Sequence, residues 1–326
     1  MQHNRVIVLR KAYVDYIKAI GIILVIIGHI NFANSNLGIK GWIYSFHMPL
    51  FFFSSGLVMK SAVVDRTFLS KKVKTLLLPF VLWGLIYSEL TIKNIAYIVY
   101  GSYDTLKRAN SLTSLWFLPA MFFGIVAAQF VITILNKSYL QVLSICILGM
   151  VGITIPKYEL GYPWCIDVSL LAAAFILLGF LVDQLLYNKS KIVMFIFFAV
   201  GAAGTMMFRF NVVQENGYVL MARRYVGNPF LFFVVSICGC LMIYGISKLL
   251  DNGKLENKFL EFVGSNTLAI FATHKPLIKI CEEIFIHISL PWFVELVCTT
   301  VTVLVISCFL VVLINRFIPI LNGKNK

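Results

Sequence analysis

The sequence predicts an all-α polytopic membrane protein with about ten transmembrane helices and both termini in the cytoplasm. Apolar residues make up 60% of the chain and charged residues only 13%, whereas about a quarter of residues are charged in a soluble domain. The mean hydropathy is correspondingly high, at +0.89. A chain of 326 residues can supply about ten helices of ~20 residues joined by short connections.

Ten apolar stretches mark the expected spans, which are 12–31, 41–60, 75–93, 115–135, 140–156, 165–187, 191–209, 228–250, 262–282 and 290–315. An even number of spans places both termini on one side of the membrane. The segments expected on that side hold 17 Lys and Arg residues, and the opposite loops hold 8. Because basic residues are enriched in cytoplasmic loops, this side is expected to be the cytoplasmic one.

The whole chain is expected to form one membrane-embedded domain, residues 1–326, with short cytoplasmic tails at 1–11 and 316–326. The longest external loops, about 94–114 and 210–227, mix aromatic and polar residues and are suited to fold over the mouth of a cavity. The net charge of +14 is attributed to basic cytoplasmic loops rather than to nucleic-acid binding. The seven cysteines show no metal-ligand spacing, so no metal site is expected.

The first span carries the most informative ionisable residues. Lys18 and His29 are eleven positions apart, which at roughly 100° per residue places both on one face of a helix. Lipid does not tolerate such a stripe, so this face is expected to meet protein or a wet cavity. Two simpler explanations remain open: Lys18 can extend to the membrane interface, and Asp15 lies at the right spacing for a local ion pair with Lys18.

Other polar residues lie near the ends of the expected spans. His47 is expected about two turns into the second span, and His274 lies in the outer half of the ninth. Either imidazole alone is equally compatible with a hydrogen bond to a nearby backbone carbonyl. Lys71, Lys72 and Lys74 precede the third span, where they serve either as topology signals or as a binding site for phosphate.

Together these residues suggest a ligand with an anionic head and a reactive end. A neutral imidazole at one end of a cavity suits a general base acting on a hydroxyl, and ammonium groups at the other end bind phosphate as point charges. Acyl-coenzyme A has phosphates at one end and a thioester at the other. Its arm is comparable in length to the Lys18–His29 separation, roughly 16 Å at about 1.5 Å per residue.

The chain resembles the integral-membrane acyltransferase family 3. The features that carry the resemblance are the Lys18-to-His29 spacing, FHMPLFFFSSGL at 46–57, the basic residues before LLLP, the Trp116-Phe117-Leu118-Pro119 opening of the fourth span, and SNTLAIFATH at 265–274. Their order and spacing extend over nearly the whole chain. Within the family, the chain resembles the short branch of fucose 4-O-acetylase-like enzymes and polysaccharide O-acetyltransferases, which lack an appended extracytoplasmic domain.

The resemblance implies an acyltransferase that moves acetyl from acetyl-CoA to a sugar hydroxyl of a surface glycan or its lipid-linked precursor. It implies a multi-pass protein of the plasma or inner membrane, with acetyl-CoA as acyl donor, no metal and no nucleic-acid partner. His29 matches the essential histidine of the family. Lys18 occupies the position of its basic partner, which is usually arginine, and Asp15 pairs with Lys18.

Further roles are assigned by the same resemblance. The family commonly carries two arginines three apart before the third span; here Lys71, Lys72 and Lys74 are expected to bind the CoA phosphates as a group. Three other residues are expected to bind the acceptor or to stabilise the developing oxyanion, namely His47, His274 and Trp116. Direct transfer with His29 as general base and a two-step route through an acetyl-histidine are equally permitted.

The chief alternative function is a transporter or flippase for a lipid-linked sugar. Such a protein also needs buried ionisable residues and many spans, but it is typically built from two matching halves with discontinuous helices. The sequence shows no such internal symmetry, and the stripe of Lys18 and His29 has no evident role in it.

Overall fold

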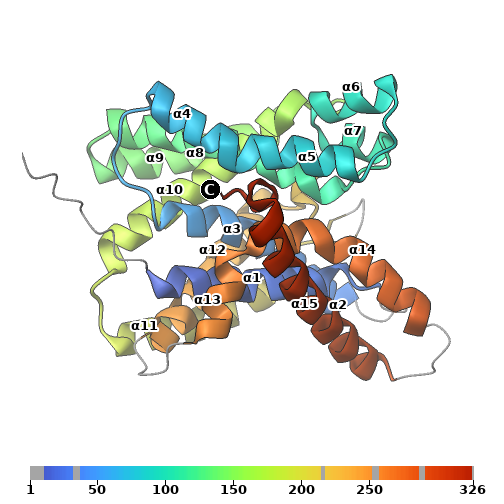
Figure 1. The fold of residues 1–326 in the computed structure, drawn as a ribbon. Coiled ribbons are helices and arrows are strands. Elements are labelled where there is room, and N and C mark those ends of the chain that lie inside the picture. The colour runs from blue at the N-terminus through green and yellow to red at the C-terminus, as the bar shows by residue number, and fades with distance from the viewer. Residues whose placement is uncertain (1–10, 32–36, 214–216, 252–256, 286–290, 325–326) are drawn as a thin grey trace, which may run out of the picture.

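The computed structural model describes residues 11–31, 37–213, 217–251, 257–285 and 291–324 (Figure 1). Over these ranges the chain forms helices and no strands, apart from one isolated bridge between Leu220 and Tyr225. The predicted all-α class is therefore confirmed. The predicted N-terminal tail lies outside the described residues except for Lys11, as do the last two residues of the C-terminal tail.

The α-helices are α1 (Ala12–His29), α2 (Leu37–Tyr44), α3 (His47–Gly56), α4 (Arg66–Lys72), α5 (Leu78–Ile86), α6 (Ile92–Tyr100), α7 (Tyr103–Arg108), α8 (Phe117–Ile134), α9 (Ser138–Thr154), α10 (Ile166–Leu186), α11 (Lys191–Thr205), α12 (Pro229–Asp251), α13 (Lys258–Ser265), α14 (Thr267–Phe285) and α15 (Trp292–Phe317). The short 3-10 segments are η2 (Thr113–Trp116), η3 (Pro163–Cys165), η4 (Met206–Phe210), η5 (Met221–Arg223) and η6 (Pro319–Asn322). A π-helical segment, η1 (Val73–Leu77), joins α4 directly to α5.

Six helical stretches within the described ranges are long and apolar enough to cross a membrane. They are Ala12–His29, Thr113–Ile134, Pro163–Leu186, Lys191–Phe210, Pro229–Asp251 and Trp292–Phe317. The other four predicted spans coincide with shorter or broken helices, namely α2 with α3, η1 with α5, α9, and α13 with α14. A membrane protein is thus supported, while a count of ten crossings stays a prediction.

Helix α10 is the centre of the packing. It contacts α3, α8 and α9, whereas α11 packs on α12 and α15 packs on α14. The apolar stretch that contains α10 is 83% buried, whereas the apolar stretches that contain α11 and α15 are only 17% and 22% buried. Since apolar side chains exposed on this scale need a nonpolar solvent, the outer faces of α11 and α15 are suited to contact lipid.

Three glycines let helix backbones touch. A Cβ on Gly56 of α3 would lie 1.9 Å from the carbonyl oxygen of Ile176 in α10, and one on Gly179 of α10 would lie 2.0 Å from the carbonyl oxygen of Phe53. A Cβ on Gly264 of α13 would lie 1.9 Å from the carbonyl oxygen of Asp15 in α1. Small residues of this kind permit the close helix approach typical of membrane bundles, and they fix the positions of α1 and α3.

The second predicted span is broken between α2 and α3. Pro49 has no N–H, so the carbonyl of Ser45 has no helical donor; it instead accepts a hydrogen bond from the Ser236 hydroxyl at 2.7 Å. The carbonyl of Ile43 accepts both from the backbone N–H of Phe46 at 3.2 Å and from Nδ1 of His47 at 2.9 Å. His47 is therefore the first residue of α3, after a break within the second predicted span.

The third predicted span is shorter than expected, and the loop after it is helical. Helix α5 ends at Ile86, not at 93, and α6 and α7 occupy the segment predicted as a loop. Thr91 caps α6 by accepting from the backbone N–H of Asn94, and Ser102 forms a capping box at the start of α7. These hydroxyl caps satisfy the free amides of each first turn.

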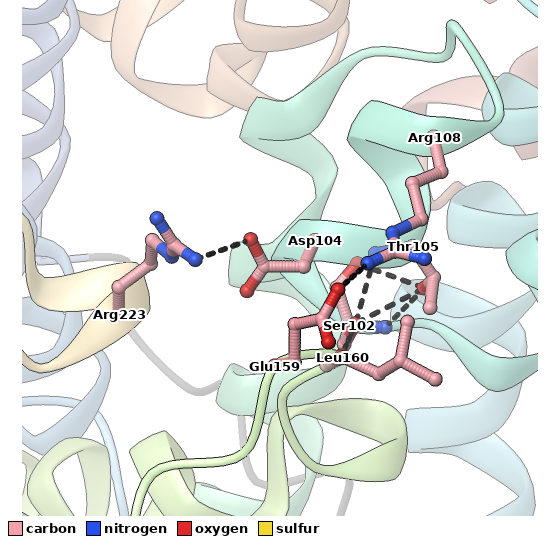
Figure 2. A network of polar contacts seen from close by, with 7 residues as sticks. All are labelled: Ser102, Asp104, Thr105, Arg108, Glu159, Leu160 and Arg223. Atoms are coloured by element: carbon pink, nitrogen blue, oxygen red, sulfur yellow. Dashed lines mark hydrogen bonds and ion pairs between the residues drawn. The ribbon is translucent and has the colours of Figure 1, made fainter.

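The segments predicted to be external are tied together by polar contacts (Figure 2). Arg223 pairs with Asp104 at 3.0 Å, and Arg108 pairs with Glu159 at 2.5 Å. The Ser102 hydroxyl also donates to the carbonyl of Leu160. In Figure 1, α6 and α7 lie at the end of the upper layer opposite α4.

The two ends of the described chain lie beside segments predicted to share one side. Nζ of Lys11 contacts the Leu57 carbonyl at 2.9 Å and an Asp183 carboxylate oxygen at 2.6 Å, beyond α3 and near the end of α10. At the other end, the backbone at Gly323 lies close to Thr75, at the start of the third predicted span, since a Cβ on Gly323 would lie 2.6 Å from the Thr75 carbonyl oxygen. The carbonyl of Leu321 accepts from the indole of Trp83, further along that span, at 2.8 Å. The assignment of this side to the cytoplasm stays a prediction based on the charge distribution.

Candidate active site

Three helix segments bring His29, Tyr44 and His274 together. His29 ends α1 and Tyr44 ends α2, and the Tyr44 hydroxyl lies 2.9 Å from Nδ1 of His29. The ring of His274, from α14, is centred 5.1 Å from the ring of His29. The structure therefore places two of the predicted site residues, His29 and His274, side by side, and Tyr44 joins them.

His47 and His274 each donate from Nδ1 to a backbone carbonyl. His47 donates to Ile43 at 2.9 Å, and His274 donates to Phe271 at 2.6 Å. A neutral ring that carries its proton on Nδ1 can only accept at Nε2. In the described part of the chain, the buried Nε2 of His274 has no hydrogen-bond partner. This arrangement favours acceptance of a hydrogen bond from a hydroxyl over donation to an oxyanion.

A cavity of about 250 Å³ opens beside His29, and we call it the histidine cavity. It is lined by His29, Asn31, Lys40, Tyr44, His47, Met48, Tyr103, Ser114, Trp116, Tyr218, Val219, Leu220, Met221, Ala222, Phe271 and Lys275. Two of the predicted acceptor-binding residues, His47 and Trp116, thus share a surface with His29. Residues 218–222 and Tyr103 come from the two long segments predicted to cover a cavity mouth.

A second cavity, of about 220 Å³, contains Lys18 and Lys72, and we call it the lysine cavity. Nζ of Lys18 lies 3.0 Å from a carboxylate oxygen of buried Asp15, which confirms their predicted pairing. Lys72 is the last residue of α4, directly before the π-helical turn η1, and π turns recur at functional sites. Lys71 and Lys74 are exposed and are not among the residues that line this cavity.

Burial changes the chemistry of Lys72. The side chain is half-buried, and loss of hydration lowers the pKa of its ammonium group below the ordinary lysine value, with a smaller contribution from Lys71. A ligand that brings negative charge restores the charged form. Lys72 is therefore the member of the predicted basic cluster best placed to respond to a bound phosphate.

Phe271 separates the two cavities and lines both of them. Its ring is centred 5.6 Å from the ring of Phe117 and 5.6 Å from the ring of His274. Phe117 in turn lies 5.8 Å from Phe51, measured between ring centroids. Phe271 and its aromatic neighbours, which we call the aromatic neck, therefore stand between the two cavities, with Lys18 in one and His29 in the other.

Sequence reasoning missed several residues of this site. Tyr44, Lys275, Ser114 and Phe271 all line the histidine cavity, yet none was singled out by pattern or spacing. Tyr44 lies three residues before His47 and Lys275 directly follows His274, so adjacency to the histidines was the available signal. Their contacts join different helices, which spacing within one helix does not predict.

Comparison with known proteins identifies the family of the whole chain. A family model described as an acyltransferase domain matches residues 11–312. The matched range contains every candidate residue named above, from Asp15 to His274. No curated protein matches the chain. Since the family model covers most of the sequence, the chain belongs to the integral-membrane acyltransferase family 3.

Proposed function

We propose that this acyltransferase moves an acetyl group from cytoplasmic acetyl-CoA to a sugar hydroxyl of a cell-surface polysaccharide or its lipid-linked precursor. The observation that carries the proposal is the pair of cavities that meet at Phe271. One contains two ammonium groups and the other contains His29. These chemistries suit the opposite ends of one acetyl-CoA molecule.

The lysine cavity is assigned to the donor's phosphates. Lys72 and Lys18 line it together, and lysine binds phosphate as a flexible point charge. Asp15 holds Lys18 at the cavity wall through their 3.0 Å contact. Lys71 and Lys74, exposed beside α4, add positive potential that attracts the anionic donor to this mouth.

The thioester is assigned to the histidine cavity, beyond the aromatic neck. In the proposed step, the oxygen of the acceptor hydroxyl attacks the thioester carbonyl carbon while Nε2 of His29 takes the hydroxyl proton. Nδ1–H then donates to the oxygen of Tyr44 across the 2.9 Å contact. The carbon–sulfur bond breaks, and the CoA thiolate leaves and receives the proton from His29. General acid–base catalysis of this kind typically accelerates a reaction by about 10²–10⁴-fold.

The acceptor is assigned to the remaining walls of the histidine cavity. Nε2 of His47 accepts from a sugar hydroxyl, and Trp116 offers an apolar wall for a sugar ring. His274 does not line this cavity and supports it from behind the ring of His29. Because this cavity is bordered by the segments predicted to be external, the acceptor is expected to enter from outside the cell. The two-step route uses the same residues, with acetyl first carried on Nε2 of His29.

Donor binding separates this function from a sugar transporter. Acetyl-CoA is expected to raise the midpoint of thermal unfolding of the purified, detergent-solubilised protein, because a ligand that binds only the folded state stabilises it. Desulfo-CoA, which has the phosphates but no thiol, is expected to stabilise as well. No stabilisation by either compound at millimolar concentration would refute acyl-CoA as the donor and would favour the transporter.

A further inference from the structure

The histidine cavity contains two cations that the proposed chemistry does not use. Lys40 comes from α2 and Lys275 from α14, and both line the cavity beside His29. Among the described residues that line it, none is Asp or Glu. Two like charges at one small cavity repel each other, and a partly buried charge without a counter-ion is costly.

The ammonium group of each lysine is oriented by uncharged neighbours. Nζ of Lys275 donates to the Thr113 hydroxyl at 3.0 Å. Nζ of Lys40 lies 5.0 Å from the ring centre of Tyr218 and 5.7 Å from that of Tyr44. A hydroxyl or an aromatic face orients an ammonium group but carries no net charge. The cavity therefore presents fixed positive charge.

A carboxylate close to this cavity belongs to Glu282, which lines an adjoining hollow of about 450 Å³ together with His29, Lys275 and Lys279. Its two oxygens accept from the backbone N–H of Asn31 at 2.7 Å and from the Asn31 side-chain amide at 3.3 Å. Glu282 is thus partly satisfied outside the histidine cavity. It moderates the positive potential around Lys40, but it is not among the residues that line the histidine cavity itself.

A buried hydroxyl gives independent support for a polar ligand in this cavity. Ser114 is only 4% exposed, and in the described part of the chain its hydroxyl has no hydrogen-bond partner. The same residue lines the histidine cavity. Buried polar groups are normally satisfied, so the Ser114 hydroxyl is available to a bound molecule. Tyr44, Tyr103 and Tyr218 surround the space with rings suited to the apolar face of a sugar.

We propose that Lys40 and Lys275 bind an anionic group carried by the acceptor sugar, either a uronate carboxylate or a sugar phosphate, beside the hydroxyl that is acetylated. This rests on the proposed function, because it names the class of acceptor for that reaction. The donor's phosphates do not fill this site, since the donor reaches the histidine cavity with its thioester end. An anion held here brings a neighbouring hydroxyl to His29 without direct contact between the anion and the imidazole.

Equilibrium binding to the purified full-length protein in nanodiscs, without acetyl-CoA, tests this assignment. The probes are a glucuronate oligosaccharide, the matched glucose oligosaccharide, and the glucose oligosaccharide bearing a 1-phosphate. The wild type is expected to bind at least one anionic probe about tenfold tighter than the neutral one, equivalent to ~1.4 kcal/mol. The preferred anionic probe distinguishes carboxylate from phosphate. Equal affinity for all three probes would overturn the proposal.

Matched charge-removing variants locate the effect. K40Q and K275Q are each expected to lose most of the preference, whereas K279Q is expected to keep it. Lys279 is one turn from Lys275, its side chain is 79% exposed, and it lies 3.9 Å from Glu283, so K279Q removes the same charge outside the cavity. A preference that survives in the K40Q/K275Q double variant would also overturn the proposal.

Two further measurements keep the result interpretable. K40Q and K275Q are expected to retain stabilisation by acetyl-CoA, which shows that they are folded and that the donor site is intact. The wild-type preference is expected to shrink as salt rises, since screening weakens charge pairing. Failure of the proposed function is seen separately, as absence of acetyl-CoA stabilisation, because the sugar-binding assay contains no donor.

Discussion

The hydroxyl of Tyr44 lies 2.9 Å from Nδ1 of His29 and joins the end of α2 to the end of α1. Their rings meet edge to face, with centroids 5.7 Å apart and planes at 81°. Since a neutral imidazole carries one proton, the partner of Nδ1 decides what Nε2 can do. With Nδ1–H donating to Tyr44, Nε2 is an acceptor and can act as a base.

Tyr44→Phe is expected to lower kcat by roughly two- to thirteenfold, because the hydrogen bond that it removes from the imidazole is worth about 0.5–1.5 kcal/mol. The KM for acetyl-CoA is expected to stay unchanged, since Tyr44 does not line the lysine cavity. Steady-state kinetics at saturating acceptor checks both values. An increase in the KM for acetyl-CoA with normal kcat would show that Tyr44 acts on the donor and not on His29.

Lys72→Gln is expected to raise the KM for acetyl-CoA by about tenfold, the cost of one charge-assisted phosphate contact. Lys74→Gln removes the same charge from an exposed position outside the lysine cavity and serves as the matched control, with a change of less than about threefold. Equal effects of the two substitutions would mean that only the overall positive potential of this region matters.

The pH dependence of donor binding follows from the lowered pKa of Lys72. As pH rises through this lowered pKa, the free lysine loses its proton and its attraction for phosphate. The KM for acetyl-CoA is therefore expected to rise at a lower pH than an ordinary lysine would give. Lys72→Arg supplies the control, since its guanidinium stays charged and its profile is expected to remain flat. Identical profiles for both proteins would contradict the role of Lys72.

Gly264→Ala is expected to destabilise the protein by about 1–3 kcal/mol, the usual range for overpacking. The added Cβ would lie 1.9 Å from the carbonyl oxygen of Asp15, so α13 must move away from α1. Thermal unfolding in detergent, monitored by tryptophan fluorescence, measures the shift. Gly38→Ala is the control, because a Cβ there meets nothing within 4 Å. A Gly264→Ala midpoint equal to that of Gly38→Ala would show that the helices are less closely packed.

Much of the fold was accessible from composition and hydropathy. All ten predicted spans coincide with helices or pairs of consecutive helices, because apolar length is a local property of the sequence. The pairing of Asp15 with Lys18 was also accessible, since both residues lie on one helix. Helix boundaries that depend on specific contacts were not accessible from the sequence. An example is Ile86, where α5 ends before α6, capped by a hydroxyl, begins.

The candidate site was predicted only in part, for a related reason. The stripe of Lys18 and His29 follows from helix periodicity within one span. The choice of Lys72 from three neighbouring lysines depends on a π turn and on the packing of α4, which periodicity does not contain. Lys40 and Lys275 lie on helices far apart in the sequence, so only the tertiary structure shows that they share a cavity.

Substitution of His29 by alanine tests the central claim most directly. In a strain that lacks the chromosomal copy, the variant is expected to accumulate to wild-type levels and to keep acetyl-CoA stabilisation, while glycan acetylation measured by mass spectrometry falls by about 10²–10⁴-fold, the usual contribution of general acid–base catalysis. Acetylation at the wild-type level in the His29→Ala strain would contradict the role of His29 as the base.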